Sequence, residues 1–242
     1  FQKNWPDEQP LAHSSFPLAP GTDQASVEAL TDEQIFESVR QNVLQGGYYL
    51  VNYDGYAGYE PGDNVVQIFS MGPLGIEALK ASQELLRRGI YANVIIVTSP
   101  DLLVGTLGRQ TQYFHLKQNL NVRSDLFLQQ ANGNLGPSEV KTLAGRRIPI
   151  VSVHDGEPGL LDNIGSIVGT RHEALCVRRH SKCGRPSEVF HFHEIDAEAI
   201  IESVGQVLSE TALEKIQVSR DVLEQVQEIQ RLNWRELWPK KN

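Results

Sequence analysis

The chain has little cysteine and no long hydrophobic run. Among its 242 residues only Cys176 and Cys183 are cysteines, too few for a disulfide framework and typical of a reducing compartment. No stretch approaches the ~18 consecutive apolar residues of a membrane helix, and the N-terminus lacks the charged and apolar regions of a signal peptide. We therefore expect neither a membrane span nor a secretory leader, and we expect the protein in the cytoplasm.

The chain also lacks an excess of basic residues. It carries 22 Lys and Arg against 30 Asp and Glu, which gives a formal net charge of −8. General binding to nucleic acids or to anionic membranes requires a basic surface, so this balance argues against both classes of partner. The remaining composition is ordinary for a globular protein, and the length is enough to bury one sizeable core.

The clearest structural signal lies in residues 64–101. Residues 64–70 are mostly apolar and β-branched, as in a strand that is buried on both faces of a parallel sheet. Residues 74–88 repeat apolar side chains at a helical period. Residues 93–98 form a second buried strand, and Ser99 is a suitable N-cap for the next helix. The pattern predicts a right-handed β-α-β crossover.

Weaker patterns predict further elements on either side of this unit. They are helices over 31–44, over 160–168 and from Asp196 onward, and strands over 48–52, 147–153 and 174–178. We expect the strand over 48–52 to pair antiparallel with the strand that starts at Asn64. The alternation of strands and helices predicts an α/β fold with an open, mostly parallel sheet, an antiparallel edge strand and helices on both faces.

The composition shifts along the chain indicate its organisation. Residues 1–30 contain four prolines among polar residues and are expected to form an irregular arm or linker. Residues 31–210 are expected to form the α/β domain, and residues 211–242 a C-terminal amphipathic helix. Residues 106–147 show only weak periodicity and leave room for an effector site, so a regulatory role stays open.

Polar residues follow several of the expected strands. In open α/β sheets, ligands and partners meet the loops beyond the carboxyl ends of the strands. We therefore regard the residues of these loops as interface or binding residues: Ser70, Gly72, Ser99, Asp101, His154, Asp155 and Glu157. A histidine beside carboxylates can act as an acid or base, so one hypothesis is an acid–base site made of His154 with Asp101, Asp155 and Glu157. The other hypothesis is that these residues are ordinary solvated strand ends, and we favour it.

Three other motifs suggest chemistry less strongly. The loop Gly72–Gly75 precedes a helix, but it matches no phosphate-binding glycine signature, which favours a structural turn. The spacing of His180, Cys183, His191 and His193 suggests zinc but lacks the close cysteine pairs of structural zinc sites. Cys176 lies in an apolar run, which favours a packing role. We assign no catalytic, cofactor-binding or metal-binding residue from the sequence.

Several short motifs resemble, in the same order, the C-terminal domain of the transketolase superfamily. They are Ser-Met-Gly-Pro-Leu-Gly (70–75) with the following helix, Val-Thr-Ser (97–99), Ile-Pro-Ile-Val-Ser-Val (148–153), Cys-Gly-Arg-Pro-Ser (183–187) and Glu-Ile-Asp-Ala (194–197). The Val-Thr-Ser ending, the Gly-Arg pair and a lead-in helix and strand over 35–49 are most similar to the homodimeric, decarboxylating pyruvate dehydrogenase. The likeness covers roughly residues 32–210.

The resemblance implies the third α/β domain of a thiamine diphosphate enzyme. In that family the first two domains hold thiamine diphosphate and magnesium, and the third completes the dimer. This sequence lacks the family's Gly-Asp-Gly motif with its downstream Asn. We therefore expect a dimerisation or architectural domain, excised or separately encoded, that neither binds the cofactor nor catalyses a reaction alone.

The resemblance also implies partners. They are the thiamine-binding domains, a second copy in a homodimer, and a dihydrolipoyl acyltransferase. The alternative is an independent α/β domain that binds a small molecule at the loops after the strands.

Overall fold

The protein is described by a computed structural model that covers residues 32–122 and 147–213. The expected N-terminal arm and residues 123–146 of the weakly periodic segment lie outside these residues. So does most of the expected C-terminal helix, although a helix that includes residues 197–213 runs through residue 211 without a break.

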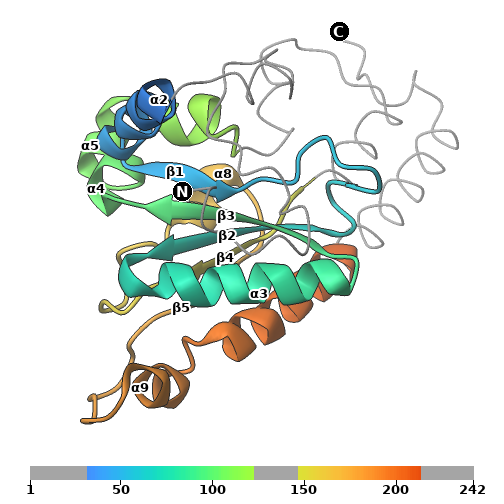
Figure 1. The fold of residues 1–242 in the computed structure, drawn as a ribbon, viewed down its shortest axis with the longest axis vertical. Coiled ribbons are helices and arrows are strands. Elements are labelled where there is room, and N and C mark those ends of the chain that lie inside the picture. Colours follow the sequence, from blue (N-terminus) through green and yellow to red (C-terminus); the bar gives the residue numbers. More distant parts are fainter. Residues whose placement is uncertain (1–31, 123–146, 214–242) are drawn as a thin grey trace, which may run out of the picture.

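A five-stranded sheet forms the centre of the domain, with the strand order β1-β3-β2-β4-β5 (Figure 1). The strands are β1 (Gly47–Val51), β2 (Val65–Met71), β3 (Tyr91–Val97), β4 (Ile150–Val153) and β5 (His172–Leu175). β2 pairs in parallel with both β3 and β4, β4 pairs in parallel with β5, and β1 pairs antiparallel at the outer edge of β3. The expected fold class is confirmed.

The expected partner of the first strand was wrong. β1 does not pair with β2 but with β3, where Gly47 lies opposite Val97. The physical reason is that both edges of β2 are already occupied by parallel partners, which leaves the free edge of β3 for β1. The chain between β1 and β2 is then held to β3, because Asn93 accepts a hydrogen bond from the Tyr53 backbone N–H at 2.7 Å and donates to the Tyr59 hydroxyl at 3.0 Å.

The helices surround the sheet on both faces. They are α2 (Asp32–Leu44), α3 (Gly75–Arg87), α4 (Pro100–Leu103), α5 (Thr106–Gln110), α8 (Ile164–Val168), α9 (Pro186–His193) and residues 197–213, with a π-helical turn at His115–Asn119. Within residues 32–122 and 147–213, none of the helices combines the length and apolar character needed to cross a membrane.

The sequence patterns located most of these helices but missed α9. The Asp196 carboxylate caps the last described helix by accepting a hydrogen bond from the Ala199 N–H at 3.0 Å, as expected. The missed signal for α9 was Pro186 in its first turn, together with Glu188, whose carboxylate accepts from the Arg185 N–H at 3.1 Å.

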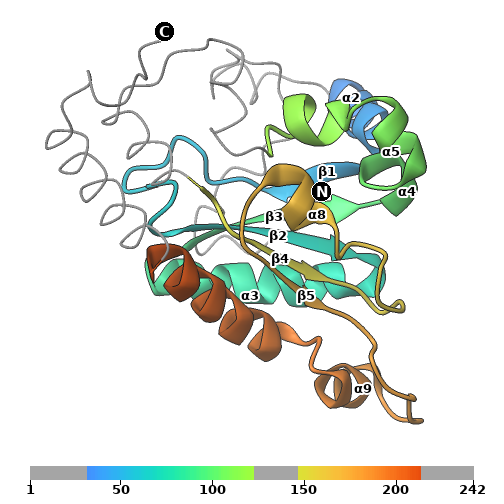
Figure 2. The same ribbon diagram turned by 180° about the vertical axis from the view of Figure 1, so that it is seen from behind.

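Two hydrophobic cores lie on the two faces of the sheet. Successive strand residues alternate between them, so that Ile68 belongs to one core and the adjacent Phe69 to the other. The first core is closed by α3 and the helix of residues 197–213, and the second by α4, the π-helical turn and α8 (Figures 1 and 2). The domain is therefore a three-layer α/β/α arrangement.

Asn93→Ala tests whether the buried side chain of Asn93 holds the β1–β2 connection. Asn93 is only 1% exposed, so the substitution leaves a buried N–H without a partner and should lower the free energy of unfolding by about 2–4 kcal/mol. Asn64→Ala is the matched control, because Asn64 makes two similar hydrogen bonds, to Glu60 N–H and Gly58 O, in an exposed part of the same connection. Chemical denaturation should show a clearly smaller loss for the control; equal losses would contradict this account.

Candidate functional site at the carboxyl ends of the strands

The carboxyl ends of β2 and β4 are adjacent and lead to opposite faces of the sheet. β2 continues into α3, which packs on the first core, whereas the chain after β4 leads to α8, which packs on the second. Such a switch between neighbouring parallel strands is where open α/β sheets commonly bind ligands. Gly72 and Asp155 meet here, since a Cβ atom added to Gly72 would lie 3.3 Å from Asp155 Oδ1.

The Asp155 carboxylate argues against a phosphate-binding role for the Gly72–Gly75 loop. A negative charge beside the loop opposes the binding of an anion there. Gly72 has φ +65°, a left-handed conformation that glycine adopts without strain, and it begins a short 3₁₀ turn ahead of α3. Both observations support the structural turn that the sequence favoured.

The sequence-predicted residues after β3 have local structural roles. The Ser99 side chain caps α4 by accepting a hydrogen bond from the Leu102 N–H at 3.3 Å. The Asp101 carboxylate accepts from the Leu107 N–H at 3.3 Å at the start of α5. Each side chain therefore satisfies a helix N-terminus.

The other predicted residues differ in exposure. Ser70 is buried at the end of β2, and its hydroxyl oxygen has no hydrogen-bond partner among residues 32–122 and 147–213. Gly72, Asp155 and Glu157 are exposed in the loops after β2 and β4. His154 is fully buried.

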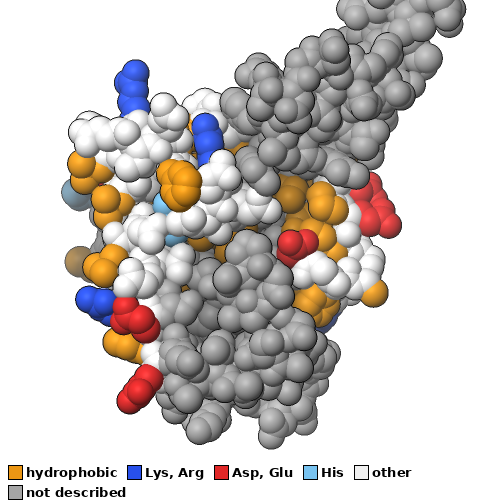
Figure 3. Space-filling model, turned by 90° about the horizontal axis from the view of Figure 1, so that it is seen from above, with side chains coloured by type: hydrophobic (Ala, Val, Ile, Leu, Met, Phe, Trp, Pro, Cys, Tyr) orange, Lys and Arg blue, Asp and Glu red, His pale blue; other side chains and the backbone are white. Residues whose placement is uncertain are grey.

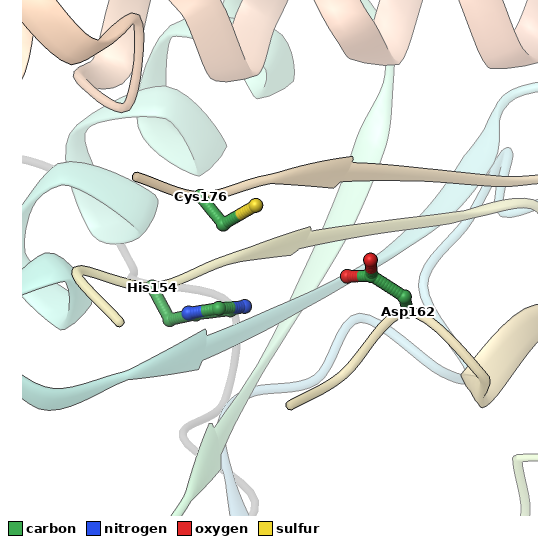
Figure 4. A group of neighbouring side chains, drawn as sticks. All are labelled: His154, Asp162 and Cys176. Atoms are coloured by element: carbon green, nitrogen blue, oxygen red, sulfur yellow. The ribbon is translucent and has the colours of Figure 1, made fainter. Parts of the chain in front are cut away.

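His154 is grouped with Asp162 and Cys176. The possible ligand atoms of these three residues all lie within 4.8 Å of one another. Figure 4 shows the three side chains directed toward a common point. The less favoured acid–base hypothesis named Asp101, Asp155 and Glu157 beside His154, and it did not include Asp162. The turn before α8 brings Asp162 back over the strand ends.

The register of two parallel strands explains why His154 meets Cys176. Val153 of β4 lies opposite Leu175 of β5, so the next pair is His154 and Cys176. The ladder continues past the strand ends, since the His154 N–H donates to Leu175 O and the Val177 N–H donates to Gly156 O, both at 3.1 Å. Because side chains alternate along strands, both residues lie on the face that carries the second core.

The position of Asp162 is set by its two neighbours. Leu161 is buried in the second core. The Asn163 side-chain amide donates to the Val104 carbonyl oxygen at 2.9 Å, which ties this turn to the end of α4. The exposed Asp162 carboxylate is therefore held between two fixed residues.

Burial favours the neutral form of His154. It lowers the pKa of the His154 imidazole, and the carboxylates of Asp162 and Asp155 together with the Gly156 backbone only partly oppose this effect. Burial also raises the pKa of the Cys176 thiol, against the influence of Arg178. A nucleophilic cysteine requires a lowered thiol pKa, so the group does not have the electrostatics of a cysteine–histidine catalytic pair.

The buried His115 and the half-buried His172 differ from His154, because both of their ring nitrogens have hydrogen-bond partners. His115 bonds to Gly47 O at 2.7 Å through Nε2 and to Asn119 at 3.1 Å through Nδ1. His172 Nε2 lies 2.8 Å from Ser152 Oγ, and its Nδ1 accepts from the Gly165 N–H at 3.4 Å. Among the residues that the structure describes, neither ring nitrogen of His154 has a well-aligned hydrogen-bond partner, and the Gly156 backbone makes only a weak contact with the ring.

The four residues with zinc-like spacing are not brought together. His191 Nδ1 lies 2.8 Å from Asp196 Oδ2, and His193 Nε2 lies 3.0 Å from Ser181 Oγ. His180 and Cys183 are exposed. The second group of possible ligands among the described residues is instead His191, Asp196 and Glu198. No sequence pattern indicates a role for Asp162, and the apolar run around Cys176 indicates only a packing role.

Neither a family model nor a curated protein matches the chain. Among solved structures, it is similar to a transketolase mutant from Pichia stipitis at 16% identity and a TM-score of 0.41, covering 73% of this chain and 19% of that one. A transketolase from Leishmania mexicana is similar at 12% identity and a TM-score of 0.42, covering 71% and 19%. A split-gene transketolase, an inactive β4 tetramer, is similar at 15% identity and a TM-score of 0.38, covering 62% and 44%.

The similarity covers only a part of this chain and a part of each transketolase chain. The chain spans about a fifth of the length of the transketolases from Pichia stipitis and Leishmania mexicana.

Gly72→Ala tests the left-handed turn at the end of β2. An alanine at φ +65° is strained and presses against Asp155, so we expect a loss of roughly 1–2 kcal/mol in the free energy of unfolding. Gly75→Ala is the control, because Gly75 is helical and its new methyl group would meet only the flexible end of Ile96, at 3.2 Å. Thermal and chemical denaturation should show a much smaller change for the control; a Gly72→Ala chain as stable as the native one would contradict the assigned turn.

Proposed function

We propose that this chain is the C-terminal, architectural domain of a thiamine diphosphate-dependent enzyme of the transketolase superfamily, most similar to the homodimeric pyruvate dehydrogenase. The observation that supports the proposal is where the resembling motifs lie in the fold. Residues 70–75 join β2 to α3, residues 97–99 end β3, and residues 148–153 include β4. Asp196 of the Ile-Asp-Ala motif caps the helix that covers the first core. The motifs thus belong to one structural unit around β2.

The whole enzyme would decarboxylate a 2-oxo acid in the cytoplasm and pass the two-carbon unit to the lipoyl group of a dihydrolipoyl acyltransferase. In this proposal the other domains hold thiamine diphosphate and magnesium. The described residues do not form a suitable site for thiamine diphosphate and magnesium. The carboxylate of Asp155 stands beside the glycine loop that precedes α3. The ligand group around His154 offers an imidazole and a thiol where magnesium prefers oxygen ligands.

The edge at the strand carboxyl ends has the character of an interface. Exposed large hydrophobic residues follow β2, β3 and β4, namely Ile76, Leu102, Leu107 and Leu160. Figure 3 shows hydrophobic side chains along the left edge of the molecule, the side on which α4 and α5 lie in Figure 1. Exposed apolar side chains that gather at one edge favour contact with another protein surface. We propose a second copy of the chain as that partner.

The alternative is an independent domain that binds a small molecule or effector at the same edge. The observation in its favour is the buried His154 side chain, whose ring nitrogens have no well-aligned hydrogen-bond partner in the described part of the chain. The two proposals differ in what the chain does without other domains.

Calorimetric titration with thiamine diphosphate and magnesium separates the proposals. The full chain alone should give no binding heat, because its loops lack a matching set of ligands. The same titration in the presence of the thiamine-binding domains is the control and should show binding. Saturable binding to the chain alone would contradict the architectural role.

Ile76→Glu tests the interface. Ile76 is 65% exposed in the first turn of α3, where a glutamate also interacts favourably with the helix dipole, so the fold should be retained. We expect the native chain to elute as a dimer in size exclusion with light scattering, and the variant as a monomer with an unchanged circular dichroism spectrum. Leu213→Glu is the matched control, because Leu213 is 63% exposed but does not follow a strand of this edge, and it should remain dimeric. A monomeric native chain, or a dimeric Ile76→Glu chain, would contradict the proposed interface.

A further inference from the structure

We propose that His154, Asp162 and Cys176 form a zinc site that links the ends of β4 and β5 to the turn before α8. The three residues offer one imidazole nitrogen, one carboxylate oxygen and one sulfur, all within 4.8 Å of one another (Figure 4). Nothing in the proposed architectural function requires this group, so the two proposals stand independently.

The spacing of the ligand atoms suits a tetrahedral ion. Zinc lies about 2.0–2.3 Å from nitrogen, oxygen and sulfur ligands, which places tetrahedral ligands roughly 3.3–3.8 Å apart. The separations in the protein are at most 4.8 Å, so the ligands close by no more than about 1.5 Å when the ion enters. His154 and Cys176 sit on paired strand ends. The closure therefore falls mainly on rotation of the exposed Asp162 side chain.

The buried imidazole of His154 independently supports a metal site. Its side chain is 0% exposed, and among the described residues neither ring nitrogen has a well-aligned hydrogen-bond partner, since the Gly156 backbone makes only a weak contact with the ring. Burying a polar group without a partner is unfavourable. His115 and His172, by comparison, have partners for both ring nitrogens. A metal ion between His154, Asp162 and Cys176 supplies the missing partner of one ring nitrogen.

The three types of ligand favour zinc or cobalt over magnesium and calcium. Thiolate, imidazole and carboxylate together are the ligands of zinc and cobalt, whereas magnesium and calcium take oxygen ligands. The Cys176 thiol releases its proton to solvent when the metal binds, so one thiolate and one carboxylate balance the charge of a divalent ion. Asp162 is exposed, which gives the ion a route to the site and leaves room for water as a fourth ligand.

Arg178 is a cationic side chain whose charge acts on both His154 and Cys176. Its guanidinium is exposed and donates a hydrogen bond to the Ala174 carbonyl oxygen at 2.8 Å. The positive charge is therefore in contact with solvent, where it is screened, and it does not occupy the space between the three ligands.

The experiment is a titration of the metal-free full chain with Co²⁺ under reducing conditions, followed by displacement with Zn²⁺. We expect one Co²⁺ per chain with a sulfur-to-cobalt charge-transfer band. Cys176→Ser should lose this band. Cys183→Ser is the matched control, because Cys183 is the exposed second cysteine, and it should keep the band. No bound Co²⁺, or a band lost in Cys183→Ser and kept in Cys176→Ser, would overturn the proposal.

A second pair of variants separates binding from folding. His154→Leu removes the ligand together with a buried group that lacks a partner, so the metal-free variant should be at least as stable as the native chain. It should bind Co²⁺ at least tenfold more weakly, and Zn²⁺ should no longer raise its unfolding temperature. His191→Leu alters the exposed group of His191, Asp196 and Glu198 and should bind as the native chain does. Loss of binding in His191→Leu with retention in His154→Leu would place the metal elsewhere and overturn the proposal.

Discussion

The parallel pairing of β2 with both β3 and β4 is the constraint on which the rest of the structure depends. Because β2 has no free edge, the antiparallel strand β1 is displaced to the far side of β3. Because its residues alternate between two buried faces, helices must cover both sides of the sheet. Because its neighbours run in the same direction, their carboxyl ends and the loops that follow them meet at one edge.

That edge has two different surfaces, and they support two different functions. Its outward side carries exposed apolar residues such as Ile76 and Leu102, which favour contact with another protein surface. Its inward side, beneath the turn before α8, carries His154 and Cys176 at the paired ends of β4 and β5. The proposed metal ion would tie two strand ends to the next turn, and the proposed interface does not depend on it.

The candidate site shows that a polar residue at a strand end often has a local structural role and not a binding role. Local hydrogen bonds use two of them, Ser99 and Asp101, to cap the next helices. His154 directly follows β4, as the sequence indicated, but its close neighbours are Asp162 and Cys176. Asp162 is eight positions further along the chain than His154, and nothing in the intervening sequence indicates that the turn returns to the strand end. The contact depends on Asn163, which binds the end of α4 far from it in sequence.

By itself the sequence determined the strands and helices with strong hydrophobic periodicity, the α/β class and the parallel core from β2 to β4, because periodicity is a local property of the chain. It also determined the caps at Ser99 and Asp196, since a cap and its helix are adjacent in sequence. Only the tertiary structure decided the partner of β1, the register that sets His154 opposite Cys176 and the return of Asp162. Strand pairing and register are choices between distant segments, made by the burial and hydrogen bonding of the whole sheet.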